Sequence, residues 1–139
     1  GEAIDDGAVV ALQPPRVLLA DDDPMVRHLA TSILESGGYR VRQARDGVEA
    51  LSIIDAGEDV SLVVTDLRMP GLGGDGLVQQ LRSRVQTAML PIIVLTGSDE
   101  YDTEVKLMDA GADDYIRKPI DPPRFLARVK AALRRAGVS

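Results

Sequence analysis

The residues of this sequence best suited to chemistry are aspartates, a threonine and a lysine that follow short apolar runs. They are Asp21, Asp22 and Asp23, then Asp66, Thr96 and Lys118. Carboxylates that gather in one place raise one another's pKa, and a hard divalent cation such as Mg2+ relieves that repulsion through oxygen ligands. A carboxylate beside such an ion, with a lysine and a hydroxyl nearby, is suited to attack phosphorus. The sequence therefore favours phosphoryl chemistry, provided that the fold brings these residues together.

The apolar runs themselves predict the strands of a parallel sheet. They lie at residues 17–20, around Val41, and at residues 62–65, 92–96 and 115–116. Runs that are apolar at consecutive positions, rich in β-branched residues, suit strands that are covered on both faces. We therefore interpret all five as strands.

Five stretches with helical spacing alternate with these runs. Their starts are marked by Asp23-Pro24, by the capping-box-like pair Asp46 and Glu49, by Gly74-Asp75, by the segment before Val105, and by Pro122-Pro123. The first helix is expected to end at Gly37-Gly38 and the fourth at Gly111. The residues expected to face the core are Val26, Leu29, Ala30, Ile33 and Leu34; Leu51 and Ile54; Leu77, Val78 and Leu81; Val105, Leu107 and Met108; and Phe125, Leu126, Val129 and Leu133.

Five strand–helix units in succession predict an α/β fold. Right-handed crossovers wind such units into a doubly wound (βα)5 three-layer sandwich. In sheets of this kind the ligand site lies beyond the carboxyl ends of the strands. Four of the five predicted strands end in, or lead into, the polar residues named above. We therefore expect those residues to converge at one edge of the sheet.

Length and composition indicate one domain with a short tail at each end. The chain has 139 residues, close to the size of one domain. Residues 1–15 contain glycines, an acidic pair and a terminal Pro-Pro, which predicts a linker or tail there, followed by a domain at 16–136 and a C-terminal tail at 137–139. The net charge of −6 and the aromatic content of 3% argue against nucleic-acid binding by the domain itself. Cysteine is absent, which excludes thiolate metal sites, and no apolar run is long enough to cross a membrane. A cytoplasmic location is the expectation.

Four segments together resemble the response-regulator receiver family, the phosphoacceptor half of two-component signalling within the CheY-like superfamily. The segments are 17–23 (VLLADDD), 66–71 (DLRMPG), 95–97 (LTG) and 111–119 (GADDYIRKP). The last segment is most similar to the OmpR/PhoB-type branch, whose members are winged-helix transcription factors. The resemblance covers about residues 16–136. It implies a parallel five-stranded sheet in the order 2-1-3-4-5 and a cis peptide bond between Lys118 and Pro119.

The resemblance also implies a role for each site residue. Asp66 would accept a phosphoryl group from a phosphohistidine of a histidine kinase or a histidine phosphotransfer protein. The implied magnesium ligands are Asp21, Asp22, Asp66 and the backbone carbonyl of Arg68. Lys118 and Thr96 would bind the phosphate, and Thr96 would act with Tyr115 as the conformational switch. Arg68 and Ser98 would tune the lifetime of the aspartyl phosphate. Such a domain is not an enzyme with a separate substrate, since it promotes only its own phosphorylation and dephosphorylation.

The partners implied are the phosphodonor, an output domain on the same chain or a separate one, and a second copy of this chain. Phosphorylation would switch the face formed by the fourth helix, the fifth strand and the fifth helix, and a homodimer would form through ion pairs on that face. The residues concerned are Glu104, Asp109, Asp114, Arg124, Arg128 and Lys130. In the OmpR/PhoB-type branch the position of Glu104 would carry a base and that of Arg124 an acid, so this pair is exchanged here.

Other interpretations remain beside this one. A protein-interaction module that works without phosphorylation would use the same fold. A haloacid-type phosphatase would need an Asp-x-Asp-x-Thr motif after the first strand, which the sequence lacks there, and a flavin-nucleotide carrier would need a phosphate loop where three aspartates stand. His28, the only histidine, is interpreted as a surface residue, and residues 71–74 lack the pattern of a phosphate-binding P-loop.

Overall fold

The structure is a computed structural model and describes residues 13–97 and 101–138, apart from the side chains of residues 101 and 102. Strands and helices alternate throughout these residues. The strands are β1 (Arg16–Ala20), β2 (Arg40–Ala44), β3 (Leu62–Asp66), β4 (Ile92–Thr96) and β5 (Asp114–Arg117). The helices are α2 (Pro24–Ser36), α3 (Gly47–Asp55), α4 (Gly74–Arg82), α5 (Tyr101–Ala110) and α6 (Pro122–Arg135).

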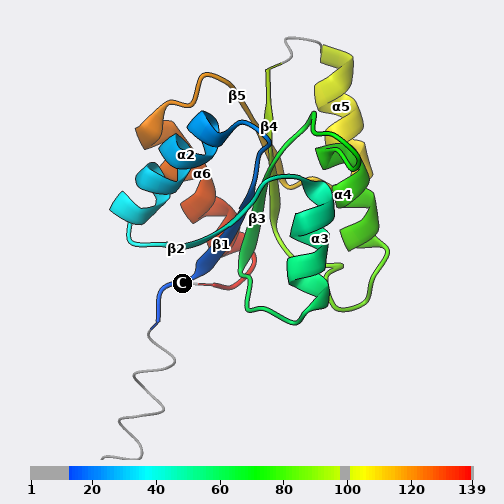
Figure 1. Cartoon of the computed structure of the whole chain (residues 1–139), viewed down its shortest axis with the longest axis horizontal. Coiled ribbons are helices and arrows are strands. Elements are labelled where there is room, and N and C mark those ends of the chain that lie inside the picture. The colour runs from blue at the N-terminus through cyan, green and yellow to red at the C-terminus, as the bar shows by residue number, and fades with distance from the viewer. Residues whose placement is uncertain (1–12, 98–100, 139) are drawn as a thin grey trace, which may run out of the picture.

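The five strands form one parallel sheet in the order β2-β1-β3-β4-β5. The predicted fold class and strand order are thereby confirmed (Figure 1). Because β1 and β3 are neighbours, with Ala20 opposite Thr65, the residues that follow β1 lie beside the end of β3. In the same way Asp66 lies opposite Leu95 of β4, and Thr96 lies opposite Arg117 of β5.

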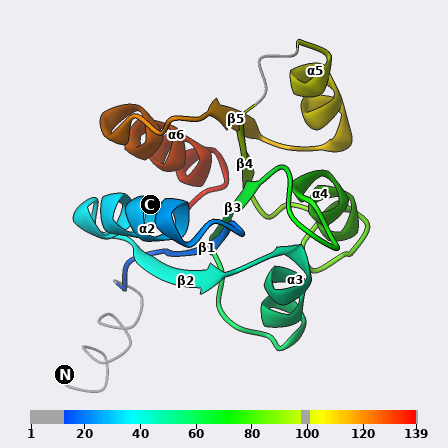
Figure 2. The same cartoon turned by 45° about the horizontal axis from the view of Figure 1, so that its top comes forward.

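Helices cover both faces of the sheet, α2 and α6 on one side and α3, α4 and α5 on the other (Figures 1 and 2). Successive residues of a strand point to opposite faces, so β1 contributes Val17 and Leu19 to one core and Leu18 and Ala20 to the other. All four side chains are fully buried. This double burial is the physical reason for the uninterrupted apolar runs in the sequence.

Local signals placed the helix starts correctly. Asp23 caps α2 by accepting the Met25 N–H at 2.9 Å, with Pro24 in the first turn. Asp46 caps α3 by accepting the Glu49 N–H at 2.8 Å. The Glu49 carboxylate returns a bond to the N–H of Arg45 at 2.8 Å, one residue before the cap. The pair therefore behaves as a capping box shifted by one residue.

The predicted inward-facing residues are confirmed only in part. In α3 the predicted Leu51 and Ile54 are half-buried and pack against the core, while Ala50 and Ile53 are the buried hydrophobic side chains. Three other predictions are wrong, because their side chains are 40–48% exposed: Leu29 on α2 and Val105 and Met108 on α5. Helical periodicity alone therefore predicted a wider buried face for α2 and α5 than the structure has.

An arginine at the end of α4 fastens the turn that leads into β5. The Arg82 guanidinium donates to the carbonyls of Gly111 at 2.9 Å and Leu90 at 2.6 Å, and it pairs with Asp113 Oδ2 at 2.9 Å. Gly111 has φ +113°, and a Cβ there would lie 2.9 Å from the Arg82 side chain. Asp113 Oδ2 also accepts the Ile92 N–H at 2.7 Å, so one cluster fixes the starts of both β4 and β5.

Candidate functional site

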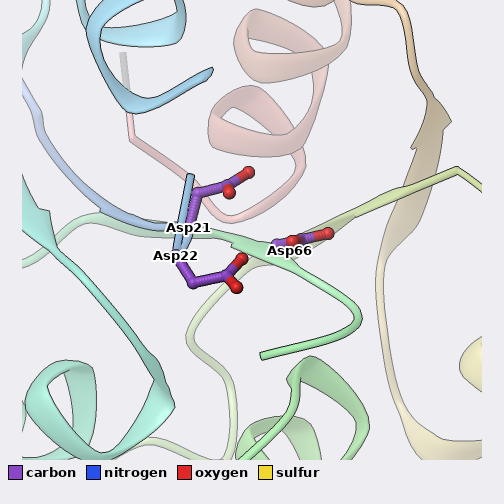
Figure 3. A group of neighbouring side chains, drawn as sticks. All are labelled: Asp21, Asp22 and Asp66. Atoms are coloured by element: carbon purple, nitrogen blue, oxygen red, sulfur yellow. The ribbon is translucent and has the colours of Figure 1, made fainter. Parts of the chain in front are cut away.

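Three carboxylates meet at the carboxyl ends of β1 and β3. Asp21 and Asp22 directly follow β1, and Asp66 is the last residue of β3. One carboxylate oxygen of each lies within 4.8 Å of the others, and Figure 3 shows the three side chains gathered in one place. Asp21 is fully buried and Asp66 is 8% exposed, whereas Asp22 is exposed. The convergence expected from strand order is therefore present in the structure.

The loop that carries the first two aspartates is held by its own polar groups. Asp21 Oδ1 accepts the N–H of Asp23 at 2.9 Å, and the Arg27 guanidinium donates to the Asp21 carbonyl at 2.6 Å. Sequence reasoning missed Arg27, because nothing in its spacing distinguishes it from a solvated helix residue. On the other side of the cluster, a Cβ on Gly74 would lie 2.4 Å from the Asp66 carbonyl oxygen. Glycine thus allows the start of α4 to pack directly on the end of β3.

Lys118 joins the cluster from the residue after β5. Its Nζ lies 3.1 Å from Asp21 Oδ2 and 3.2 Å from Asp66 Oδ1. Its backbone N–H donates to the carbonyl of Thr96 at 2.8 Å, and its peptide bond to Pro119 is cis, as the resemblance implied. The lysine is therefore tied both to the carboxylates and to the end of β4.

The electrostatics of the cluster follow from this burial and crowding. Burial and the charge of Asp21 raise the pKa of Asp66, and the ammonium of Lys118 opposes that rise only in part. Burial lowers the pKa of Lys118, but its hydrogen bonds to Asp21 and Asp66, together with their charges, raise it overall. The lysine stays protonated at neutral pH, while the Asp66 carboxylate carries unrelieved repulsion. A cation bound among the three aspartates would relieve it.

The donor set fits a hard divalent cation. All three side chains offer carboxylate oxygens, which is the chemistry that Mg2+ prefers and which thiolate- or imidazole-seeking metals do not. Arg68 lies two residues after Asp66 in the segment between β3 and α4, and its side chain is exposed. Thr96 is almost fully buried at the end of β4, the strand next to β3. His28 is exposed on α2, as predicted.

Tyr115 lies on β5, and its side chain contacts α5. Its hydroxyl donates to Glu104 Oε2 at 2.8 Å, and Arg117 Nε donates to Glu104 Oε1 at 2.8 Å. Glu104 is 9% exposed. The sequence placed Glu104 only among the surface charges of a dimer face, and no local signal connects it with Tyr115.

The other charged residues assigned to that face divide into two groups. Asp114 and Arg128 pair with each other within the chain, with Nη1 2.8 Å from Asp114 Oδ1. Asp109, Arg124 and Lys130 are exposed. Ser98, named as a lifetime-tuning residue, lies outside the described residues. Across the part of the chain that the structure describes, no helix has the length and apolarity to cross a membrane.

Comparison with known proteins decides the family. A family profile described as the response regulator receiver domain matches residues 17–130. The chain belongs to this family. Among curated proteins, it is 46% identical over 122 residues to the response regulator MprA of a Mycobacterium species, a match that covers 88% of this chain and 52% of that protein. It is 39% identical over 122 residues to RpaA of Synechocystis, described as a DNA-binding dual master transcriptional regulator, covering 87% of this chain and 50% of that protein.

Solved structures show the same receiver fold. The receiver domain of the Francisella response regulator 1452 superposes with a TM-score of 0.80 at 32% identity, covering 87% of this chain and 98% of that one. A CheY-like receiver domain protein from Methanospirillum hungatei gives a TM-score of 0.81 at 30% identity, covering 89% and 97%. The chain spans about half the length of the curated relatives it matches. The comparisons therefore establish a receiver domain of a two-component response regulator.

Proposed function

We propose that this receiver domain accepts a phosphoryl group on Asp66 from a phosphohistidine of a histidine kinase or phosphotransfer protein. The observation that carries the proposal is the position of the Asp66 carboxylate, which stands between two further carboxylates and the Lys118 ammonium. Burial and the charge of Asp21 raise the pKa of Asp66, and phosphorylation would remove the charge that is repelled there.

The transfer is a displacement at phosphorus. A carboxylate oxygen of Asp66 attacks the phosphorus atom, the P–N bond of the phosphohistidine breaks, and its electron pair leaves with the imidazole nitrogen. The product is an aspartyl phosphate. The Lys118 ammonium, already 3.2 Å from Asp66, balances charge on the transferred group, and the Thr96 hydroxyl donates to one of its oxygens.

Magnesium is the cofactor that the site supports. Asp21, Asp22, Asp66 and the backbone carbonyl of Arg68 would hold the ion. When bound, Mg2+ neutralises charge that accumulates between the carboxylates and the incoming phosphoryl group. The three carboxylates have only the Lys118 ammonium as a counter-charge among these residues, so the site keeps a net negative charge. This negative charge supports a bound divalent cation.

The domain acts on itself and turns over no separate substrate. It promotes its own phosphorylation and the later hydrolysis of the acyl phosphate, with Arg68 and Ser98 as the positions that set the lifetime. The output is a change in the face formed by α5, β5 and α6, driven through Thr96 and Tyr115. Because RpaA is described as a DNA-binding transcriptional regulator, we extend the proposal to an output domain that controls transcription.

The deciding experiment is intact mass spectrometry after incubation with Mg2+ and acetyl phosphate. Wild type is expected to gain one phosphoryl group that hydroxylamine removes, as an acyl phosphate requires, and Asp66→Asn is expected to gain none. Asp59→Asn is the matched control, because Asp59 is exposed and pairs with Arg40 on the surface. Wild type that gains no adduct and also fails to bind beryllium trifluoride with Mg2+ would favour a phosphorylation-independent interaction module.

A further inference from the structure

The carboxylate of Glu104 joins α5 to β5 through both of its oxygens. Oε2 accepts the Tyr115 hydroxyl at 2.8 Å, and Oε1 accepts Arg117 Nε at 2.8 Å and also pairs with the same guanidinium through Nη2. Both partners stand on β5, two residues apart, and therefore project from the same face of that strand. Glu104 itself is nearly buried, so this carboxylate depends on these partners in place of water.

This cluster is connected to the phosphoryl site through a few residues of β5. Arg117 lies opposite Thr96 in the register of β4 and β5. The next residue, Lys118, donates its backbone N–H to Thr96 and its ammonium to Asp21 and Asp66. A displacement of Thr96 or Lys118 on phosphorylation therefore acts directly on the strand that carries the partners of Glu104.

We propose that Glu104 is a positioning residue that acts through Tyr115: together with Arg117 it holds the tyrosine hydroxyl against α5 in the unphosphorylated domain and opposes the switch. The inference rests on the proposed function, since it concerns the regulation of the same site. If one conformation is stabilised by this contact and the other by phosphate, loosening the contact must strengthen phosphate binding, by at most the free energy that the contact contributed.

The charge distribution supports a firm contact. Hydrogen bonds from Arg117 and Tyr115 lower the pKa of Glu104, and the hydrogen bond to Glu104 raises the pKa of Tyr115. The carboxylate is thus ionised and the phenol protonated at neutral pH, which is the combination that makes a charge-assisted hydrogen bond. Such bonds are stronger than those between neutral groups, so their loss is measurable as a change in a conformational equilibrium.

The test measures the affinity for beryllium trifluoride in the presence of Mg2+, because this anion mimics a phosphoryl group on aspartate. Binding is followed by 19F NMR. The ring signals of Tyr115 are followed separately in a chain that carries Tyr39→Phe and Tyr101→Phe, where Tyr115 is the only tyrosine left. The variant is Glu104→Gln. The matched control is Glu35→Gln, which makes the same chemical change at an exposed position of α2.

The expected result has two parts. Glu104→Gln binds beryllium trifluoride about fivefold more tightly than wild type, a modest allosteric coupling, and its ligand-free Tyr115 signals move toward those of ligand-bound wild type. Glu35→Gln changes neither measurement. An unchanged affinity in Glu104→Gln, with or without a shift of the Tyr115 signals, would overturn the inference while the proposed function stands. Wild type that binds no beryllium trifluoride would instead overturn the proposed function and this inference with it.

A second variant keeps the inference testable if Glu104→Gln does not fold. Tyr115→Phe removes only the hydroxyl and is expected to tighten beryllium trifluoride binding as well. If both variants fold, the double variant should bind no more tightly than Glu104→Gln alone, because both changes break the same contact. Fully additive effects of the two changes would show that they act independently, and would overturn the role of Glu104.

Discussion

Lys118 holds its ammonium group between two carboxylates, 3.1 Å from Asp21 Oδ2 and 3.2 Å from Asp66 Oδ1. The lysine is a quarter exposed, Asp21 is fully buried, and Asp66 is nearly so. It thus supplies a counter-charge to carboxylates that have little access to water. At the same time its backbone N–H donates to the Thr96 carbonyl, so this one residue links the end of β5 to the ends of β1, β3 and β4.

Replacing this lysine should destabilise the metal-free domain. Lys118→Met keeps the alkyl chain but leaves two crowded carboxylates without their shared partner. We expect the free energy of unfolding to fall by about 2 kcal/mol, since losing one partner of a buried ion pair is costly and partial exposure of Lys118 moderates the cost. Urea unfolding in the presence of a metal chelator measures this. Saturating Mg2+ should recover much of the loss, and a loss of the same size with Mg2+ would contradict the electrostatic cause.

Removing the charge of Asp66 should have the opposite effect. We expect Asp66→Asn to raise the metal-free unfolding free energy by about 1 kcal/mol at neutral pH, within the usual range for single substitutions. The pKa of Asp66 is raised by folding, so the folded domain binds a proton more readily than the unfolded chain, and stability falls as pH rises through the folded pKa. The advantage of asparagine should therefore be largest at neutral pH and shrink as pH falls below the folded pKa of Asp66.

Thermal melts of both proteins without metal, at neutral and acidic pH, measure this advantage. Asp59→Asn serves as the control, because it removes an exposed carboxylate of the same type. A lower melting temperature for Asp66→Asn at neutral pH would mean that the three carboxylates do not repel one another as their spacing indicates.

As the pH falls, magnesium binding should begin to weaken at a higher pH than it would at a site of carboxylates with ordinary pKa values. Protons compete with the ion for Asp66, whose pKa is raised by burial and by Asp21. The stabilisation by Mg2+, read as the rise in melting temperature, should therefore be larger at neutral pH and decline as the pH falls toward the raised pKa of Asp66. Titration calorimetry with Mg2+ at several pH values tests this. An affinity that stays constant until the pH reaches the ordinary aspartate range, near about 4, would count against the shift.

The fold and the metal-binding part of the site could be predicted because they depend on short-range signals and on topology. Apolar runs identified β1, β3 and β4, which are buried on both faces, and caps such as Asp23 and Asp46 identified helix starts. The rule that parallel strands end at one edge then brought Asp21, Asp22 and Asp66 together without any knowledge of side-chain positions.

The remaining contacts depend on how each helix is rotated and which side chains meet across elements. Helical spacing indicated Leu51 and Ile54, which pack against the core while partly exposed, but it did not identify Ala50 and Ile53 as the buried hydrophobic side chains of α3. The contact of Glu104 with Tyr115 joins a helix and a strand through a single buried carboxylate. Periodicity places Glu104 only on a charged helix, and a charged residue in that setting is normally solvated.

Dimer formation through the face of α5, β5 and α6 is the last expectation to test. Asp114 and Arg128 already pair within the chain, whereas Asp109 on α5 and Lys130 on α6 are exposed and available to a second copy. In a two-fold dimer each such pair forms twice.

Beryllium trifluoride with Mg2+ should therefore shift wild type toward a dimer in light scattering, and Asp109→Lys should reduce that shift. Because opposite charges attract in either order, Asp109→Lys combined with Lys130→Asp should restore it. Activated wild type that stays monomeric at high concentration would rule the dimer out, and a double variant no better than Asp109→Lys would place the contact elsewhere on this face.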